Sequence, residues 1–305
     1  LEAERKKQFN YHFRKRNMEV NGSNMQDAGV QAILCVTPVD TIALVLSHEV
    51  IVEITLNKHV RLSHGGALAA TICRGGSVAA VHHPSLHIVQ QKTQVQFDLA
   101  EGVLVSAASN ALHVFGLASQ DSTTRVHTVT KNEVLKHDDL SVATDRFADG
   151  WCSWDTTRAL LLEEVAGGEV VGIQEDKRAR CLLVARRAII DLNNSLLSAI
   201  VEGVKIKHDV CSGDTRVYCG RNFISLCVAT HALTLHSPWV EINVDRSART
   251  RLVRGDQIIE TTHRRLHLMQ NTMQAHFFLP SVAGQDEPSC DNLDHVRKPL
   301  FALSS

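Results

Sequence analysis

The residues best suited to chemistry lie in a short stretch that begins His64-Gly65-Gly66 and ends at Pro84. A histidine exchanges a proton near neutral pH, so His64 is a candidate general base, with helix capping or packing as the alternative. Paired glycines allow close backbone approach where a helix begins, and free amides at a helix start favour an anion. Cys73 carries a potential nucleophile, but a thiol in an apolar run without an activating neighbour is usually inert packing.

The residues after the glycines predict the element that positions them. Ala, Leu and Ile at positions 67–72 would make a helix over 65–82 apolar nearly all round, so we expect this helix to be buried. The flanking segments are rich in Val, Ile and Thr, and alternation is visible at 86–97 and 123–130. The order predicted is strand, helix, and then three or four antiparallel strands.

The same unit is expected to recur in the second half of the chain. Four landmarks repeat at offsets of 155, 154, 153 and 154 residues: Gly65 and Gly220, Pro84 and Pro238, Gly102 and Gly255, and Leu112 and Leu266. A chain of landmarks at nearly constant offset indicates a duplicated unit, with a second Gly-led helix over 219–238. His113 and His267 then occupy equivalent positions.

These motifs resemble a known family. Residues 61–83, RLSHGGALAATICRGGSVAAVHH, are similar to the entry and central helix of hotdog-fold acyl-CoA thioesterases. The segment from Gly220 through VEINVDRSARTRLVRGDQIIETTHRRLHLMQ resembles the C-terminal half of mitochondrial double-hotdog acyl-CoA thioesterases. The resemblance implies an α+β fold of tandem hotdog domains. Each domain would be an antiparallel β-sheet wrapped around a central α-helix, and the two would form a pseudo-dimer within one chain.

The composition shifts along the chain suggest its division into parts. The expected parts are an exposed arm (1–28), a first hotdog domain (29–135), a linker with a short helix in TTRALLLEEV (136–180), a second hotdog domain (181–282) and an extension (283–305).

The resemblance also implies thioester hydrolysis, with the Gly65 and Gly66 amides holding the oxyanion. The family's acid would fall at Cys73 in the first copy and Val228 in the second, and neither is a carboxylate. His64 would then be the remaining base, and Asn222 and His231 are the other polar candidates.

Other site predictions are few. Arg249, Arg251 and Arg254 could receive the phosphates of CoA, or could form a solvated strand and loop face. The sequence predicts no metal site, and CoA enters only as part of a possible substrate. The cysteines show no CxxC pairing, which favours reduced thiols.

The missing acid favours a thioesterase-like protein that has lost catalysis and serves as a structural or interaction subunit of a larger assembly. The alternative is an active acyl-CoA thioesterase that hydrolyses acyl-CoA to free acid and CoA. A ribonucleoprotein association through Arg246–Arg254 and His263–Arg265 is compatible with the first function.

The composition limits the remaining classes of function. A formal net charge of −1 argues against general binding to nucleic acid or a membrane surface. No apolar run approaches the length of a transmembrane helix. The basic, polar start is typical of a processed mitochondrial protein, so the matrix is the expected location, with the cytoplasm as the alternative.

Overall fold

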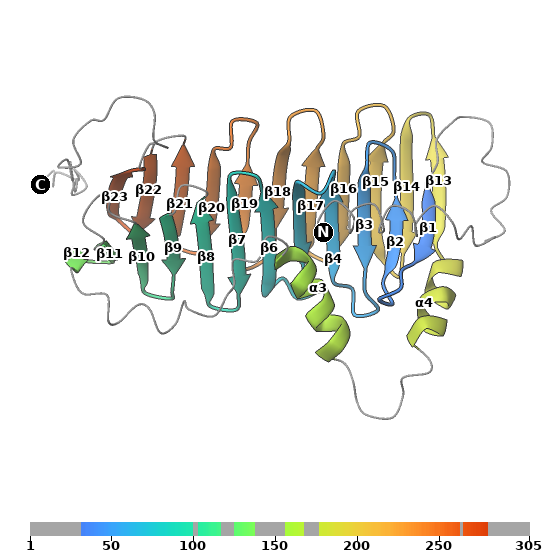
Figure 1. The fold of residues 1–305 in the computed structure, drawn as a ribbon, viewed down its shortest axis with the longest axis horizontal. Helices are drawn as coiled ribbons and strands as arrows, with labels where there is room; N and C mark the ends of the chain where they lie inside the picture. The colour runs from blue at the N-terminus through green and yellow to red at the C-terminus, as the bar shows by residue number, and fades with distance from the viewer. Residues whose placement is uncertain are drawn as a thin grey trace, which may run out of the picture.

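The computed structural model describes residues 32–99, 103–116, 125–137, 156–167, 177–262 and 265–279. These residues form two large antiparallel sheets and two helices, and in each sheet every strand pairs with its neighbours in sequence (Figure 1). The first sheet contains β1 (Ile33–Val36), β2 (Ile42–Val45), β3 (Val50–Ile54), β4 (Val60–His64), β5 (Leu68–Ile72), β6 (Val78–His83), β7 (Leu86–Gln91), β8 (Gln94–Leu99), β9 (Val103–Ala107), β10 (Ala111–Gly116), β11 (Arg125–Thr130) and β12 (Val134–His137).

The second sheet follows the helices α3 (Thr156–Gly167) and α4 (Lys177–Arg186). It contains β13 (Ile189–Asn193), β14 (Leu196–Val201), β15 (Val204–Asp209), β16 (Thr215–Cys219), β17 (Asn222–Cys227), β18 (Ala232–His236), β19 (Glu241–Val244), β20 (Thr250–Arg254), β21 (Gln257–Thr262), β22 (Arg265–Gln270) and β23 (Met273–Phe278).

Local sequence explains the hairpins. In β15, the residues of VKIKHD alternate between buried and exposed, as expected for a strand with one covered face. The preceding turn, Glu202-Gly203, has positive φ at both residues (48° and 82°), the conformation that closes a two-residue hairpin with the correct twist. Two-residue turns also join β16 to β17, β20 to β21 and β22 to β23.

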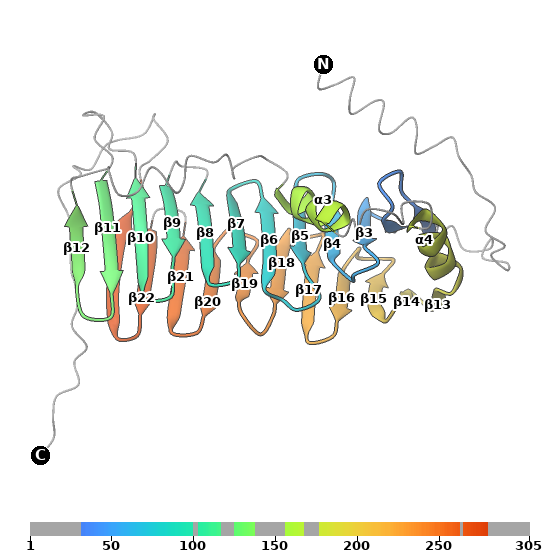
Figure 2. The ribbon, with the colours of Figure 1, turned by 90° about the horizontal axis from the view of Figure 1, so that it is seen from below.

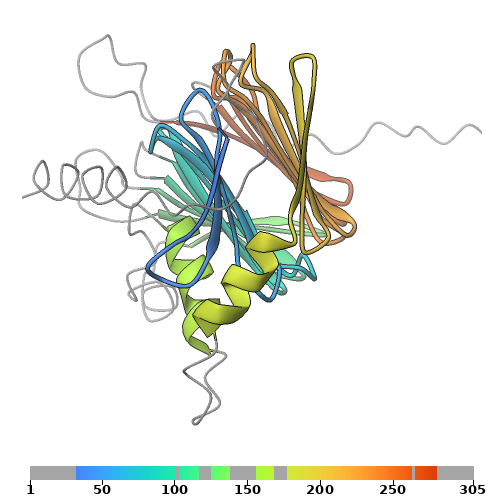
Figure 3. The same cartoon turned by 90° about the vertical axis from the view of Figure 1, so that its right-hand side faces the viewer.

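The two sheets stack face to face and share one apolar core (Figure 3). Leu62 and Val105 from the first sheet and Ile224 and Leu252 from the second are at most 1% exposed within this core. The strand order of both sheets advances in the same direction along the molecule (Figure 1). The architecture is therefore an elongated β-sandwich.

Matching strands of the two sheets are separated by a nearly constant distance in sequence. β5 begins at Leu68 and β17 at Asn222, 154 residues later, and the same offset relates β10 to β22. Leu112 and Leu266, which occupy equivalent positions in β10 and β22, are both fully buried. The landmark offset in the sequence is therefore also the offset between matching strands, but the repeated unit is one sheet.

Part of the outer face of the first sheet is covered by α3, which packs on β4, β5 and β6 (Figure 2). Leu160 of this helix is buried against Ala80 and Val89. The helix lies where the sequence TTRALLLEEV predicted one.

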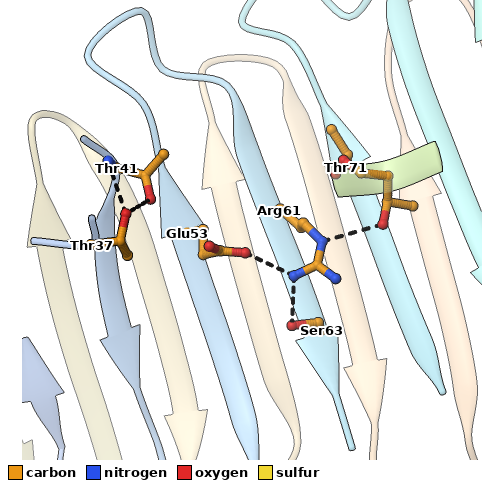
Figure 4. Close-up of polar contacts among 7 residues, drawn as sticks. Thr37, Thr41, Glu53, Arg61, Ser63 and Thr71 are labelled. Atoms are coloured by element: carbon orange, nitrogen blue, oxygen red, sulfur yellow. Dashed lines mark hydrogen bonds and ion pairs between the residues drawn. The ribbon is translucent and has the colours of Figure 1, made fainter. Parts of the chain in front are cut away.

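Polar contacts fix the start of α3 on the sheet (Figure 4). Arg61 donates to Glu53 at 2.7 Å, to Ser63 at 3.2 Å and to the Thr157 hydroxyl at 3.2 Å. Thr71 donates to the Thr157 carbonyl at 2.9 Å. Because Arg61 and Glu53 are mostly enclosed, their ion pair holds a defined geometry rather than a solvated one.

The expected tandem hotdog fold is wrong. Residues 65–82, expected to form a buried helix, instead form the β4–β5 turn, β5 and most of β6. All of LAATI in β5 is buried, because the second sheet covers its inner face and α3 lies on its outer face. A strand covered on both faces reads as a continuous apolar run, which resembles a buried helix.

The second expected helix is also wrong, since residues 219–238 form β17 and β18. Residues 181–186, expected to begin a strand region, belong instead to α4. The hotdog, thioesterase and acyl-CoA descriptions depended on a central helix in each half, and the two sheets described here contain none.

Several expected features lie outside the described residues: the arm 1–28, the extension 283–305 and residues 263–264 of the second basic segment. Neither described helix is long and apolar enough to cross a membrane.

A buried histidine joins the sheets at one rim of the sandwich. His208 in β15 is 1% exposed, and its Nε2 lies 2.7 Å from the Ser47 hydroxyl of the first sheet. Its Nδ1 lies 2.8 Å from the Thr215 hydroxyl, which donates to the Gly213 carbonyl. Because the Thr215 hydroxyl gives its proton to the Gly213 carbonyl, its oxygen accepts from His208. Nδ1 of His208 is therefore assigned as the donor to Thr215, and Nε2 as the acceptor from Ser47.

Because His208 is buried in its neutral form, we expect the stability of the fold to decrease at acid pH. Burial, helped by positive charge on His48, lowers the pKa of His208 from 6.5 to about 4. The unfolded chain therefore binds the extra proton first, so the free energy of unfolding falls as the pH drops from 6.5 toward 4. The loss should reach about 3 kcal/mol, measured by urea unfolding at a series of pH values.

His208→Gln should lower stability at pH 7.5 but flatten its dependence between pH 6.5 and 4. The control His236→Gln, in β18, should retain the wild-type slope. An unchanged slope in His208→Gln would contradict the assignment.

Candidate functional site

The structure places His64, Gly65 and Gly66 at the β4–β5 turn, away from any described helix start. The glycines have φ of +56° and +72°, which explains their presence in a tight turn. The ring centroid of His64 lies 5.8 Å from that of His231. Burial lowers the pKa of His64, and charge on His231 lowers it further. A turn of this kind lacks the helix dipole on which the predicted oxyanion site depended.

Cys73 and His64 do not meet. They lie beyond opposite ends of the five-residue strand β5, at opposite rims of the sandwich. The Cys73 sulfur accepts from the Val78 amide at 3.2 Å, a packing role. Val228 lies in the β17–β18 loop beside Gly213, where a Cβ would be 2.9 Å from it.

The three arginines expected to bind CoA phosphates are dispersed. Arg249 and Arg254 lie at opposite ends of β20, roughly 17 Å apart along an extended strand. Arg251 pairs with Glu260 at 2.9 Å, and Arg254 donates to Gln257 and to the Thr93 carbonyl. No single phosphate site results from this arrangement of the three side chains.

The Ser47–His208 pair has the hydrogen-bond order of a nucleophile and its base. The ring is enclosed between the sheets, however, and a pKa near 4 makes it a weak base at neutral pH. We therefore assign this pair to fastening the sheets. Among the described residues, no group of three His, Cys, Asp or Glu side chains could hold a metal ion.

A second junction between the sheets lies at the opposite rim, around the β5–β6 loop (residues 73–77). The Asn222 amide donates to the carbonyls of Cys73 at 3.0 Å and Arg74 at 2.8 Å. The Trp239 indole donates to the Gly75 carbonyl at 3.2 Å. Three successive carbonyls of one sheet's loop are thus held by side chains of the other sheet.

Glycine is required at the centre of this junction. Gly76 has φ of +72°, and a Cβ there would lie 2.8 Å from both the Asn222 oxygen and the Ser237 Cβ. The loop therefore approaches the second sheet more closely than any other residue type permits.

The side chains that project from this junction form a mixed cationic and aromatic surface, which we call the rim surface: Arg74, Arg221 and Trp239. Both arginines are exposed, and Trp239 is 48% exposed although its indole nitrogen is fixed. Within the described residues, no carboxylate pairs with either arginine. The cations of this region also act on a buried thiol. Burial raises the pKa of Cys219, and the positive charges of Lys58 and Arg74 oppose that rise.

Sequence reasoning missed the rim surface. Arg74 and Arg221 belong to loops almost 150 residues apart, so no local spacing links them. One available signal was Trp239, a large aromatic residue directly after Pro238, at the expected end of the second helix.

Comparison with protein families assigns the chain. A family model described as a domain of unknown function (DUF8796) matches residues 32–267, more than three quarters of the chain. The chain belongs to this family. The match spans both sheets up to β22, so the DUF8796 region includes both rim junctions. A comparison with curated proteins found no match.

Among solved structures, the chain shows a distant likeness to the TCP10 domain of Danio rerio CPAP. The wild-type domain is 10% identical, with 75% of this chain and 99% of that chain covered and a TM-score of 0.26. The same domain in complex with a peptide of Danio rerio STIL is 8% identical, with 79% and 94% covered and a TM-score of 0.17. Likeness at these TM-scores defines neither the fold nor the function of the DUF8796 chain.

The close approach at Gly76 predicts a specific loss of stability. Gly76→Ala should lower the free energy of unfolding by about 2–4 kcal/mol, because the left-handed conformation and the steric overlap both disfavour a Cβ. Urea unfolding measures the change.

Gly66→Ala provides the matched control. Gly66 has the same φ of +72°, but no atom lies within 4 Å of its would-be Cβ. Its substitution should cost only about 1 kcal/mol, the conformational part alone. Equal losses in the two variants would show that the junction is looser than described.

Proposed function

We propose that this DUF8796 protein is a protein-interaction module that serves as a structural subunit of a larger assembly. The observation that carries the proposal is the rim surface, where Arg74, Arg221 and Trp239 project from a backbone fixed by bonds between the sheets. Tryptophan and arginine are the residue types most enriched at energetic centres of protein interfaces.

Burial of Trp239 would supply a useful part of the binding energy. Covering its exposed half removes on the order of 100 Å² of mainly apolar surface, which contributes about 2.5 kcal/mol. Because its indole nitrogen already donates to Gly75, little side-chain freedom remains to be lost on binding. The surface is therefore prepared for contact before a partner arrives.

The arrangement of titratable groups supports binding over catalysis. His64 and Cys73 lie at opposite rims, and the base of the Ser47–His208 pair is enclosed and weakly basic. Binding through the rim surface needs none of these groups to react.

Substitution of Trp239 tests the function. The full chain and its Trp239→Ala variant, both affinity-tagged, would be expressed in cells of the source and recovered under native conditions. Associated proteins would be quantified by mass spectrometry. A defined set of proteins should fall at least tenfold in the variant, because loss of about 2.5 kcal/mol lowers affinity by more than that factor.

Ile189→Ala is the matched control, since Ile189 is also an exposed apolar side chain (63%) but lies on β13, away from the rim surface. It should retain the associated proteins. Equal recovery from wild type and Trp239→Ala, with both folded by circular dichroism, would refute the proposed contact.

A further inference from the structure

The geometry points to the chemistry of the partner: we infer that the rim surface binds an extended acidic segment of another protein, with carboxylates spaced three residues apart. This inference rests on the proposed function, and it adds the class of ligand and its register. It follows from where the cations lie along the rim and from the distances that sheet geometry imposes.

Cations recur along this rim at regular intervals. Alternate connections of the first sheet open onto the same rim, and three successive ones carry a basic residue: Lys58 between β3 and β4, Arg74 between β5 and β6, and Lys92 between β7 and β8. Lys131, between β11 and β12, lies farther along the rim. Lys92 lies directly beside the junction, because its amide donates to the Ser77 carbonyl at 2.7 Å. Arg74 and Lys92 are exposed, and the Lys58 side chain is 28% exposed.

The spacing of these cations follows from strand geometry. Neighbouring strands lie about 4.8 Å apart, so connections two strands apart lie roughly 10 Å apart. An extended chain rises about 3.3 Å per residue, so three residues cover the same distance. Side chains three apart lie on one face only if the segment adopts the polyproline II form, which has three residues per turn and a rise of about 3.1 Å per residue. A segment of that form that crosses the strand ends would therefore meet one cation at every third residue.

The second sheet supplies the other wall of this path. Arg221 lies beside Arg74, because the amide of the adjacent Asn222 donates to the Arg74 carbonyl. Arg254 donates to the carbonyl of Thr93, next to Lys92. Trp239 lies between these two arginines along the rim, where it can pack against an apolar side chain of the segment.

The charge balance favours an acidic ligand at the centre of the path. Asp40 and Glu133 lie at the two ends of the rim, in the β1–β2 and β11–β12 connections. Nearer the centre, Glu202 lies 4.0 Å from Lys58, and Asp256 accepts from Gln270. Arg74, Lys92 and Arg221 lie at the centre of the path, and within the described residues no carboxylate pairs with any of the three. Guanidinium groups bind carboxylates in bidentate fashion, which suits Arg74 and Arg221 as the central contacts.

A protein segment fits this path better than a nucleic acid. Binding of single strands usually combines a continuous basic groove with several aromatic faces for stacking. The rim offers one exposed indole and cations roughly 10 Å apart, and carboxylates such as Glu202 interrupt the positive charge.

A fluorescence titration tests the inference. Trp151→Phe and Trp154→Phe leave Trp239 as the only tryptophan of the chain, which then reports directly on the rim surface. The probes are two synthetic peptides of identical composition, one with Glu at positions i, i+3 and i+6 and Leu at i+4, the other with three contiguous Glu residues. The spaced peptide should bind at least tenfold more tightly, and its affinity should fall as salt increases.

Side-chain substitutions locate the binding. Arg74→Ser and Arg221→Ser should each weaken the spaced peptide about tenfold. Arg216→Ser, an exposed arginine on the outer face of β16, should leave its affinity unchanged.

Three results would overturn the inference: equal affinity for the two peptides, no saturable change in Trp239 fluorescence, or tighter binding of a single-stranded oligonucleotide of similar charge. The two proposals fail separately. If Trp239→Ala releases associated proteins while neither peptide binds, the interaction function stands and the acidic ligand is wrong.

Discussion

Burial of two sheet faces against each other is the interaction on which the rest of this structure depends. Each sheet is a run of hairpins that needs only short turns and alternating side chains to form. Each has an apolar face that water would disfavour, and the shared core shows that each face is covered by the other sheet. Apart from the small cluster that α3 forms on the outer face of the first sheet, the described residues of each sheet depend on this shared core.

Hydrogen bonds at the two rims satisfy polar backbone groups that the packing of the sheets would otherwise leave without partners. Loops that cross a rim bring backbone carbonyls near the edge of an apolar core, and these groups need partners. At one rim, Ser47, His208 and Thr215 form a chain of hydrogen bonds, and at the other Asn222 and Trp239 satisfy three carbonyls of the β5–β6 loop. These bonds connect loops that are far apart in sequence, and they make the rim backbone firm enough to hold exposed side chains in place.

The sequence predicted part of this fold, and physical reasons explain the rest. Alternation located β11, and the apolar patch in TTRALLLEEV located α3. β5 was mistaken for a helix because α3 removes the alternation that an open strand would show. β17 is different: burial alternates along NFISLC, but polar Asn222 takes a buried position and apolar Phe223 a partly exposed one, so the sequence itself shows no clear period of two. The resemblance to hotdog proteins depended on treating both segments as helices.

The candidate site was less accessible from sequence than the fold. His64, Gly65 and Gly66 were chosen because adjacent residues can form one site, yet here they serve a turn. The contact of Arg74 with the neighbourhood of Arg221 arises only when the sheets stack. In a sandwich of this kind, residues about 150 positions apart in the sequence lie side by side on the surface. Motifs that span only a few residues cannot reveal such pairs.

That long separation has a consequence for synthesis in the cell. At about 5–20 residues per second, a ribosome needs on the order of ten seconds to make the residues that separate β5 from β17. During that interval the first sheet can pair its hairpins, but its apolar face has no cover. The nascent chain is therefore exposed to aggregation until the second sheet has been made. We expect a chaperone that shields flat apolar surfaces to affect the yield of folded protein more than the stability of the final fold does.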